Sequence, residues 1–138
     1  MGSRGCMPID AATRFELLDT YARYGHSYDD GDFEQWAACF TVDGVLWTSR
    51  GLEVRGRQGL QEFARSRTAG IRTPERHLSW HHLFTPTDGG VQGRCSAGIV
   101  RTTTEGVGFV FVATYRDRLV FDDGLWRLAL REVHFDTP

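Results

Sequence analysis

The second half of the chain constrains the fold most, because it reads as four long extended segments in succession. These segments are rich in β-branched and aromatic residues and cover residues 76–84, 90–103, 106–121 and 125–135. Short turns, "TPTDGG", "TEG" and "DDG", separate them. Because turns this short join neighbouring antiparallel strands, the sequence predicts one antiparallel sheet built from successive hairpins.

The first half is predicted to begin with a helix that follows Asp10, a typical N-cap residue. Residues 11–27 repeat apolar and aromatic side chains at helical spacing. Two adjoining stripes are expected to face the core, and they consist of Leu17, Tyr21, Tyr24 and Tyr28 and of Phe15, Leu18, Ala22 and Gly25. Tyr28 and its neighbour Asp29 then lie at the end of this helix, at the rim of whatever it covers.

Two further helices and two short strands are expected between these regions. Asp32 is a plausible cap for a helix at residues 33–40, and residues 57–68 show one apolar face opposite a basic one. Strands are expected at residues 45–50 and 51–56. The order predicts an α+β fold in which N-terminal helices cover a curved, cone-shaped antiparallel sheet and enclose a hydrophobic cavity.

Length and composition predict a single globular domain at residues 9–138, after a start at residues 1–8 that is disordered or left over from expression. The chain is 41% hydrophobic and 25% charged, with a net charge of -2, so nothing favours a nucleic-acid or membrane-surface partner. No apolar run approaches the ~20 residues of a membrane helix. A small-molecule substrate is therefore the expected partner.

The cysteines give no indication of a metal site or a disulfide framework. Cys6, Cys39 and Cys95 are odd in number, and none belongs to a CxxC pair. We interpret them as reduced thiols in a cytoplasmic protein.

The segment "RHLSWHHLF" contains the main candidates for acid–base chemistry. Strand alternation places His77 and His81 on one face and His82 on the other. A histidine with an ordinary pKa of about 6.5 exchanges protons at neutral pH, and a neighbouring carboxylate fixes its tautomer. Asp29 is a candidate for that carboxylate. Structural roles remain open for both residues, because strand histidines commonly pack in the core and an Asp beside Gly commonly forms a turn.

A metal site formed by His77, His81 and Asp29 is disfavoured, because residues four apart on a strand lie ~13 Å from each other. Phosphate-binding glycine loops and dinucleotide fingerprints are absent, so no cofactor is expected. In the predicted strand at residues 106–121, alternation places five residues on one face, namely Phe109, Phe111, Ala113, Tyr115 and Asp117. If that face lines the cavity, Tyr115 can orient a substrate oxygen, and core packing is the alternative.

The segments "YARYGHSYDDGDFEQWAACFTVDGVLW", "GLQEFARSRT", "RHLSWH" and "YRDRLVFDDGLWRLALREV" together resemble the nuclear transport factor 2-like superfamily, in its SnoaL-like branch. The resemblance implies the cone-shaped α+β fold described above. It leaves the reaction open, because this fold hosts dehydratases, isomerases, cyclases, epoxide hydrolases and noncatalytic subunits.

Within this branch, "HSYDDGDFEQW" and "RHLSW" are most similar to the catalytic segments of scytalone dehydratases. The resemblance implies that Tyr28 polarises a substrate carbonyl, that His77 moves the proton and that Asp29 orients the imidazole. Together with the residue patterns described above, it gives a set of expected substrate-binding residues, namely Tyr24, Trp47, His81, Arg101 and Tyr115. Trp47 stands where that family has a second pocket tyrosine, and Arg101 lies near the position of its second histidine, so the scytalone substrate itself is not implied.

The expected function is that of a cofactor-independent dehydratase or isomerase acting on a small cyclic carbonyl or polyketide-type substrate. A polyketide cyclase or an epoxide hydrolase, with Arg101 binding an oxyanion, is the alternative within the enzymes. A noncatalytic small subunit, like those of ring-hydroxylating dioxygenases, is the alternative outside them. The segments "FVFV" and "LWRLAL" are apolar on both faces, which favours a homodimer or homotrimer.

Overall fold

The computed structural model describes residues 8–71 and 73–138, so Cys6 and nearly all of the predicted disordered start lie outside the described residues. The elements follow the predicted order of helices before long strands. They are α1 (Ala11–Asp29), α2 (Phe33–Ala38), β1 (Phe40–Thr48), β2 (Glu53–Arg55), α3 (Arg57–Thr68), β3 (Glu75–Thr87), β4 (Gly90–Thr103), β5 (Gly106–Asp122) and β6 (Leu125–Phe135). The α+β class predicted from the sequence is confirmed.

The strands form one six-stranded sheet in the order β2-β1-β6-β5-β4-β3. β3 to β6 pair antiparallel through consecutive hairpins, as the short turns predict. The expectation of a purely antiparallel sheet is wrong at one place, because β1 pairs with β6 in parallel. No tight turn joins these two strands, so tertiary packing, and not loop length, determines their relative direction.

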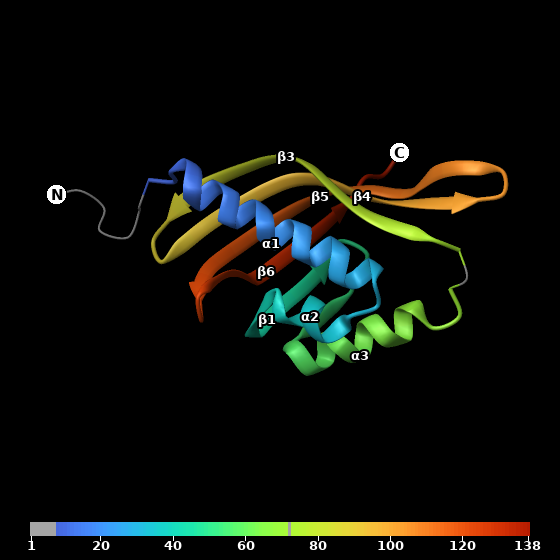
Figure 1. Ribbon diagram of the computed structural model, residues 1–138, viewed down its shortest axis with the longest axis horizontal. Coiled ribbons are helices and arrows are strands. Elements are labelled where there is room, and N and C mark those ends of the chain that lie inside the picture. The colour runs from blue at the N-terminus through green and yellow to red at the C-terminus, as the bar shows by residue number, and fades with distance from the viewer. Residues whose placement is uncertain (1–7, 72) are drawn as a thin grey trace.

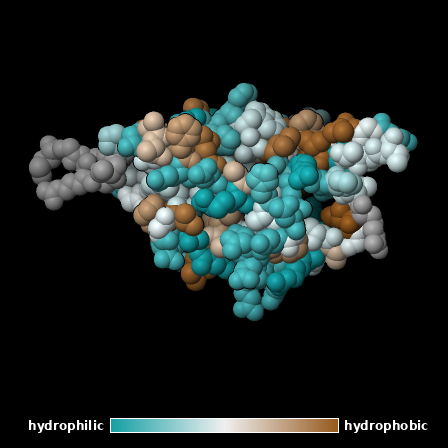
Figure 2. All heavy atoms as spheres, in the orientation of Figure 1, coloured by the Kyte–Doolittle hydropathy of each residue, from teal (hydrophilic) through white to brown (hydrophobic). Residues whose placement is uncertain are grey.

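The helices lie on one side of the bent sheet (Figure 1). Helix α1 crosses the strands, whereas α2 and α3 lie beside β1. The strands β4 and β5 continue past the helices as a long hairpin. Apolar residues are exposed near its tip, among them Val107 and Phe109, and brown surface gathers in this region in Figure 2. Because the helices cover only one side of the sheet, the core lies between α1 and this inner face.

Helix α1 begins as predicted, because the Asp10 carboxylate accepts a hydrogen bond of 2.7 Å from the backbone N–H of Thr13. The stripe that contains Leu17, Tyr21 and Tyr24 is buried. The adjoining stripe is not buried as predicted, because Phe15 is 69% exposed, Ala22 is exposed as well, and Leu18 and Gly25 are only half-buried. The buried face of α1 is thus narrower than predicted along the whole helix.

The turn after α1 divides its acidic residues by role. Asp30 is the C-cap residue, Gly31 has a φ of 76°, and the Asp32 carboxylate accepts a hydrogen bond from the backbone N–H of Gln35 to cap α2. These three residues account for the turn. Asp29, which precedes them, is left for another role.

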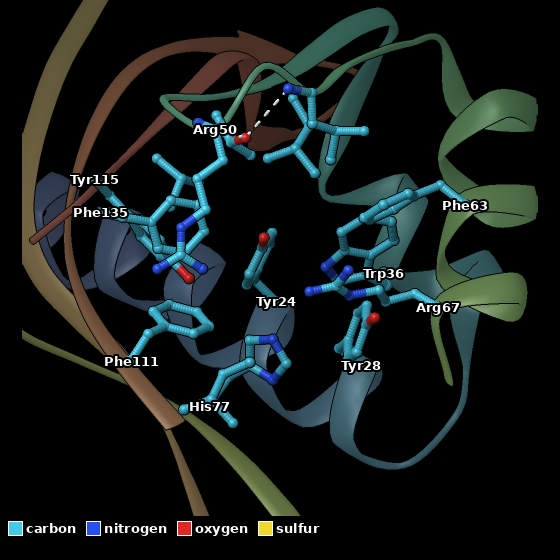
Figure 3. A pocket seen from close by; sticks show the side chains of 15 residues that line it. Tyr24, Tyr28, Trp36, Arg50, Phe63, Arg67, His77, Phe111, Tyr115 and Phe135 are labelled. Carbon is cyan, nitrogen blue, oxygen red and sulfur yellow. Dashed lines mark hydrogen bonds between the residues drawn. The ribbon is translucent and has the colours of Figure 1, made fainter. Parts of the chain in front are cut away.

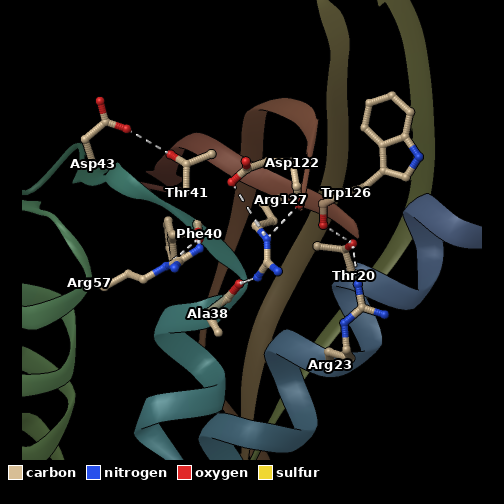
Figure 4. Close-up of polar contacts among 10 residues, drawn as sticks. All are labelled: Thr20, Arg23, Ala38, Phe40, Thr41, Asp43, Arg57, Asp122, Trp126 and Arg127. Atoms are coloured by element: carbon tan, nitrogen blue, oxygen red, sulfur yellow. Dashed lines mark hydrogen bonds and ion pairs between the residues drawn. The ribbon is translucent and has the colours of Figure 1, made fainter. Parts of the chain in front are cut away.

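Arginine side chains hold the junction between α2 and β1 (Figure 4). The last backbone carbonyl groups of a helix have no hydrogen-bond partner within the helix, and the arginines supply one here. Arg127 donates to the carbonyl oxygens of Ala38 and Asp122. Arg57 donates two hydrogen bonds, of 3.0 and 2.8 Å, to the carbonyl oxygen of Phe40. These bonds tie α2, α3 and β6 to the start of β1, which forms one wall of the cavity described below.

A charged network lies inside the core. The Arg131 Nε and Nη2 groups donate to the two carboxylate oxygens of Asp117 at 2.9 and 3.0 Å, and the Tyr21 hydroxyl donates to the same carboxylate. The Arg131 and Asp117 side chains are only 1% and 0% exposed. The Arg131 Cζ atom lies 4.2 and 3.9 Å from the ring centres of Tyr24 and Tyr115. The network therefore connects α1 with β5 and β6.

Two cysteines, Cys39 and Cys95, are buried as free thiols. Burial raises the pKa of Cys95 to about 12, which keeps its thiol protonated and unreactive. Among the described residues, no helix is both long and apolar enough to span a membrane.

We expect Asp117→Asn to lower the free energy of unfolding by ~3–5 kcal/mol, because the substitution leaves the Arg131 charge buried without its counterion. Urea denaturation followed by circular dichroism measures this loss. The matched control is Glu53→Gln, which breaks the Arg55–Glu53 ion pair, whose side chains are 70% and 48% exposed. That change should cost less than ~1 kcal/mol. Equal effects of the two substitutions would contradict the importance of the buried pair.

Candidate functional site

A cavity of about 270 Å³ lies between the helices and the inner face of the sheet (Figure 3). Side chains from every helix and from all strands except β2 contribute to its wall. Seven of the 15 lining residues carry the aromatic rings of Phe, Tyr or Trp, namely Tyr24, Tyr28, Trp36, Phe63, Phe111, Tyr115 and Phe135. Among the described residues, the other polar side chains of the lining belong to Thr48, Arg50, Arg67 and His77. The site thus combines apolar walls with a few convergent polar groups.

His77 and Asp29 form a hydrogen-bonded pair at this cavity. The His77 Nδ1 atom lies 2.8 Å from Asp29 Oδ1, and the two side chains are 13% and 6% exposed. The same carboxylate accepts the backbone N–H of His77 at 3.1 and 3.0 Å. Asp29 therefore holds both the backbone and the ring of one residue, which leaves little freedom for the imidazole.

The local sequence explains why these two residues meet. Asp29 is the last residue of α1, and His77 lies near the start of β3, where α1 passes over the strand. The two elements pack closely here, because a Cβ atom placed on Gly25 would lie in van der Waals contact with the His77 carbonyl oxygen, at 3.4 Å.

The pairing determines the tautomer of His77. Because a carboxylate only accepts hydrogen bonds, Nδ1 carries the proton and the neutral ring keeps its lone pair on Nε2. Nε2 has no hydrogen-bond partner in the described part of the chain, and the ring lines the cavity. His77 is thus arranged to accept a proton from a molecule in the cavity.

Two tyrosine rings pack beside the His77 ring, and a third tyrosine lies next to one of them. The Tyr28 ring centre lies 4.5 Å from that of His77, and the Tyr24 ring centre lies 6.2 Å from both the His77 and the Tyr115 ring centres. Burial raises the pKa of Tyr28 to about 12 and raises the pKa values of Tyr24 and Tyr115 as well, although the charge of Arg131 opposes the rise for the latter two. All three phenols remain protonated at neutral pH and can donate hydrogen bonds to a ligand oxygen.

Two buried N–H groups near the cavity have no hydrogen-bond partner within residues 8–71 and 73–138. They are the indole Nε1 of Trp36, which lines the cavity, and Nη1 of Arg131, which lies behind Tyr24 and Tyr115. Unpaired donors that are buried cost free energy, so they are uncommon in cores without a reason. Their position surrounds the tyrosines with positive potential.

Five of the eight site residues predicted from the sequence lie at the cavity or beside it. Tyr24, Tyr28, His77 and Tyr115 line the cavity, and Asp29 lies behind His77. The other three, Trp47, His81 and Arg101, lie elsewhere.

Trp47 is on the outer face of the sheet, where its ring centre lies 5.1 Å from that of His134. Its neighbours Leu46 and Thr48 line the cavity instead, because side chains alternate along β1. Arg101 does not reach the cavity either. It donates to the Glu75 carboxylate at 2.8 and 2.5 Å, across the β3–β4 pair. The predicted roles of Trp47 and Arg101 in substrate binding are therefore corrected.

His81 is exposed because β3 contains a bulge between Trp80 and Leu83. His81 has a φ of 57°, and the irregularity reverses the alternation after it. His82, predicted on the opposite face from His77, consequently packs on the inner side, 4.8 Å from Tyr21 between ring centres. The prediction that His77 and His81 share a face is wrong for this reason.

A second irregularity, in the β4–β5 pair, moves Phe109 away from the cavity. The register shifts between Ile99 and Val100, and Phe109 is 57% exposed with its ring centre 6.2 Å from that of Trp80. Phe111 and Tyr115 keep the expected orientation toward the cavity.

Several residues of the site were missed by the sequence analysis. Trp36, Arg50 and Arg67 line the cavity, and Arg131 lies behind it. For Arg131 a signal existed, because it lies on the inward side of a strand that pairs with the strand of Asp117, with opposite charge. For Arg50 and Arg67 no local pattern distinguishes them from surface arginines.

The chain is similar to a known domain family and to several solved structures. Residues 10–132 match the sequence model of the SnoaL-like domain. No curated protein sequence matches the chain.

Three solved structures superpose closely. A protein of unknown function from Mycobacterium tuberculosis has a TM-score of 0.83 and 31% identity, covering 92% of this chain and 73% of that one. A protein from Catenulispora acidiphila in complex with S-DNPA has a TM-score of 0.84 and 28% identity, covering 92% and 96%. The protein Aln2 from a Streptomyces species has a TM-score of 0.84 and 25% identity, covering 94% of both chains.

We expect Asp29→Asn to change the tautomer of His77. An asparagine amide can donate to Nδ1, so the ring proton moves from mainly Nδ1 toward Nε2 and occupies the lone pair that faces the cavity. The ¹⁵N chemical shifts of the two ring nitrogens, recorded where the imidazole is neutral, distinguish the tautomers.

Asp30→Asn is the matched control, because Asp30 is the exposed neighbour in the same turn. It should leave the ring shifts of His77 as they are. Unchanged shifts in Asp29→Asn would show that the carboxylate does not determine the tautomer.

Proposed function

Because this chain belongs to the SnoaL-like domain family, we propose that it binds a small cyclic carbonyl compound in the cavity and catalyses removal of a proton next to the carbonyl. The family binds small molecules and includes polyketide cyclases. The observation that carries the proposal is the His77 ring, which Asp29 holds through Nδ1 and whose Nε2 has no hydrogen-bond partner among the described residues that surround the cavity.

The size and lining of the cavity support a small, flat ligand. A volume of about 270 Å³ is close to the lower end of the ~300–1,000 Å³ that is usual for small-molecule sites. Aromatic walls contact a flat ring over a large area, and the few polar groups then determine its orientation. A ligand of one to three fused rings, with its carbonyl toward the tyrosines, suits this arrangement.

In the proposed reaction, His77 is the general base. Nε2 takes a proton from the carbon next to the carbonyl. The electron pair of that C–H bond forms a carbon–carbon double bond while the π pair of the carbonyl moves onto its oxygen, which gives an enolate. Asp29 stabilises the resulting imidazolium by accepting its Nδ1–H. A positioned base of this kind accelerates proton removal by ~10²- to 10⁴-fold.

The tyrosines are proposed to stabilise the enolate oxygen. The Tyr24 and Tyr28 rings pack beside His77, both residues line the cavity, and both hydroxyls stay protonated at neutral pH. Arg131 places positive charge behind the Tyr24 ring, 4.2 Å from its centre, which favours negative charge on the oxygen that Tyr24 contacts. Fixed donors in a site with little water are effective because they need no reorganisation when charge develops.

The fate of the enolate determines the type of reaction. Return of the proton from His77 to a β-hydroxyl group, which then leaves as water, gives dehydration. Return to a different carbon gives isomerisation, and attack of the enolate carbon on a second carbonyl gives cyclisation. The epoxide hydrolase alternative loses its basis, because the arginine suggested for it, Arg101, is engaged with Glu75.

We expect the protein to exchange the α-protons of 2-tetralone in D₂O, as followed by ¹H NMR, because all of these reactions begin with the same proton removal. His77→Gln should lower the exchange rate by ~10²- to 10⁴-fold. His81→Gln is the matched control, since His81 is an exposed histidine of the same strand. It should exchange like the unaltered protein.

Full activity of His77→Gln would contradict the assignment of the base. Binding of 2-tetralone by calorimetry without exchange above the rate in buffer would favour a noncatalytic binding protein instead.

A further inference from the structure

Two arginines line the cavity from different elements. Arg50 follows β1, and Arg67 lies in the last turn of α3. In Figure 3 their guanidinium groups extend toward the cavity from opposite sides, with Tyr24 visible between them. The cavity thus contains two positively charged side chains in a wall that is otherwise mainly aromatic.

No carboxylate neutralises these charges. No Asp or Glu residue is among the residues that line the cavity, and neither Arg50 nor Arg67 forms an ion pair within the described ranges. The positions outside those ranges, residues 1–7 and Arg72, contain no Asp or Glu either.

Four arginines form ion pairs, which are Arg55–Glu53, Arg101–Glu75, Arg127–Asp122 and Arg131–Asp117, and the other arginines of the described ranges form none. Arg50 and Arg67 differ from the rest by their position, because among the described arginines only these two line the cavity.

Arg50 is held in place without a counterion. Its Cζ atom lies 3.9 Å from the ring centre of Phe135, which also lines the cavity. Stacking on an aromatic face leaves the edge of the guanidinium, with its N–H groups, free to donate. Because the side chain is already oriented, a ligand loses less free energy in ordering it.

Arg67 contributes from the other side of the cavity. It lines the same cavity as Tyr28 and His77, and its charge opposes part of the rise in the pKa of Tyr28. A negative group bound to Arg67 in this cavity therefore shares the site with the proposed catalytic residues.

We propose that the natural ligand carries a carboxylate group that binds between Arg50 and Arg67 while its carbonyl faces Tyr24 and His77. Guanidinium groups donate two parallel hydrogen bonds to a carboxylate, and such charge-assisted bonds are stronger than neutral ones. The carboxylate also offsets the repulsion between two like charges. The identification of a cyclic carbonyl ligand rests on the proposed function, whereas the anion site rests on the arginines alone.

The test compares two probes that differ only in charge, 2-tetralone-6-carboxylic acid and its primary amide, by isothermal titration calorimetry. We expect the acid to bind about 10- to 100-fold more tightly than the amide, the range for a hydrogen bond to a charged group. The preference should decrease as salt increases, because the arginines are exposed to solvent at the cavity mouth. The affinity of the amide should change little with salt.

Arg50→Gln and Arg67→Gln should each reduce the preference for the acid. Arg65→Gln is the matched control, because Arg65 is an exposed arginine of the same helix that donates to Gln61 and does not line the cavity. It removes the same charge from the protein and should keep the preference.

Equal affinity for the two probes, no measurable binding of the acid, or an equal loss in Arg65→Gln would overturn the anion site. The readout is independent of turnover. His77→Gln should lose proton exchange and still prefer the acid, so failure of the proposed reaction and failure of the anion site give different results.

Discussion

The buried pair of Arg131 and Asp117 is the interaction on which the rest of the site depends. It joins β5 to β6, and the Tyr21 hydroxyl extends it to α1. The guanidinium is also the surface on which the rings of Tyr24 and Tyr115 pack. Burying an ion pair contributes little net stability, because desolvation offsets the attraction. Its value here is positional, since it holds two cavity tyrosines from different elements against one rigid group.

The polar groups of the site become more exposed with distance from this buried ion pair. Asp117 and Arg131 are deepest, the tyrosine hydroxyls come next, and His77 follows at the wall of the cavity. Arg50 and Arg67 are outermost. Each inner group affects the next through charge or packing, as Arg131 does for Tyr24. A ligand that enters therefore passes a charged mouth before it reaches neutral hydrogen-bond donors.

Local sequence patterns predicted the elements, because caps, helical periodicity and short turns act over a few residues. Asp10 and Asp32 cap their helices as expected, and Asp29 was left over from the turn as a candidate partner that the family resemblance assigned to His77. The parallel pairing of β1 with β6 and the bulge at His81 depend on distant packing, so strand alternation placed His81 wrongly. The resemblance placed Trp47 at the pocket, whereas it lies on the outer face of the sheet. The family resemblance supplied roles for Tyr28 and His77, but no local pattern distinguished Arg50 and Arg67.

The hydrogen bond from the His77 backbone to Asp29 has a consequence for the sheet as a whole. β3 is an edge strand, and edge strands present unpaired N–H groups on which another chain can add a strand. The Asp29 carboxylate occupies the His77 N–H, so the end of α1 covers this position of the open edge. The same carboxylate that orients the imidazole thereby removes one N–H group of β3 from those that could pair with a strand of another chain.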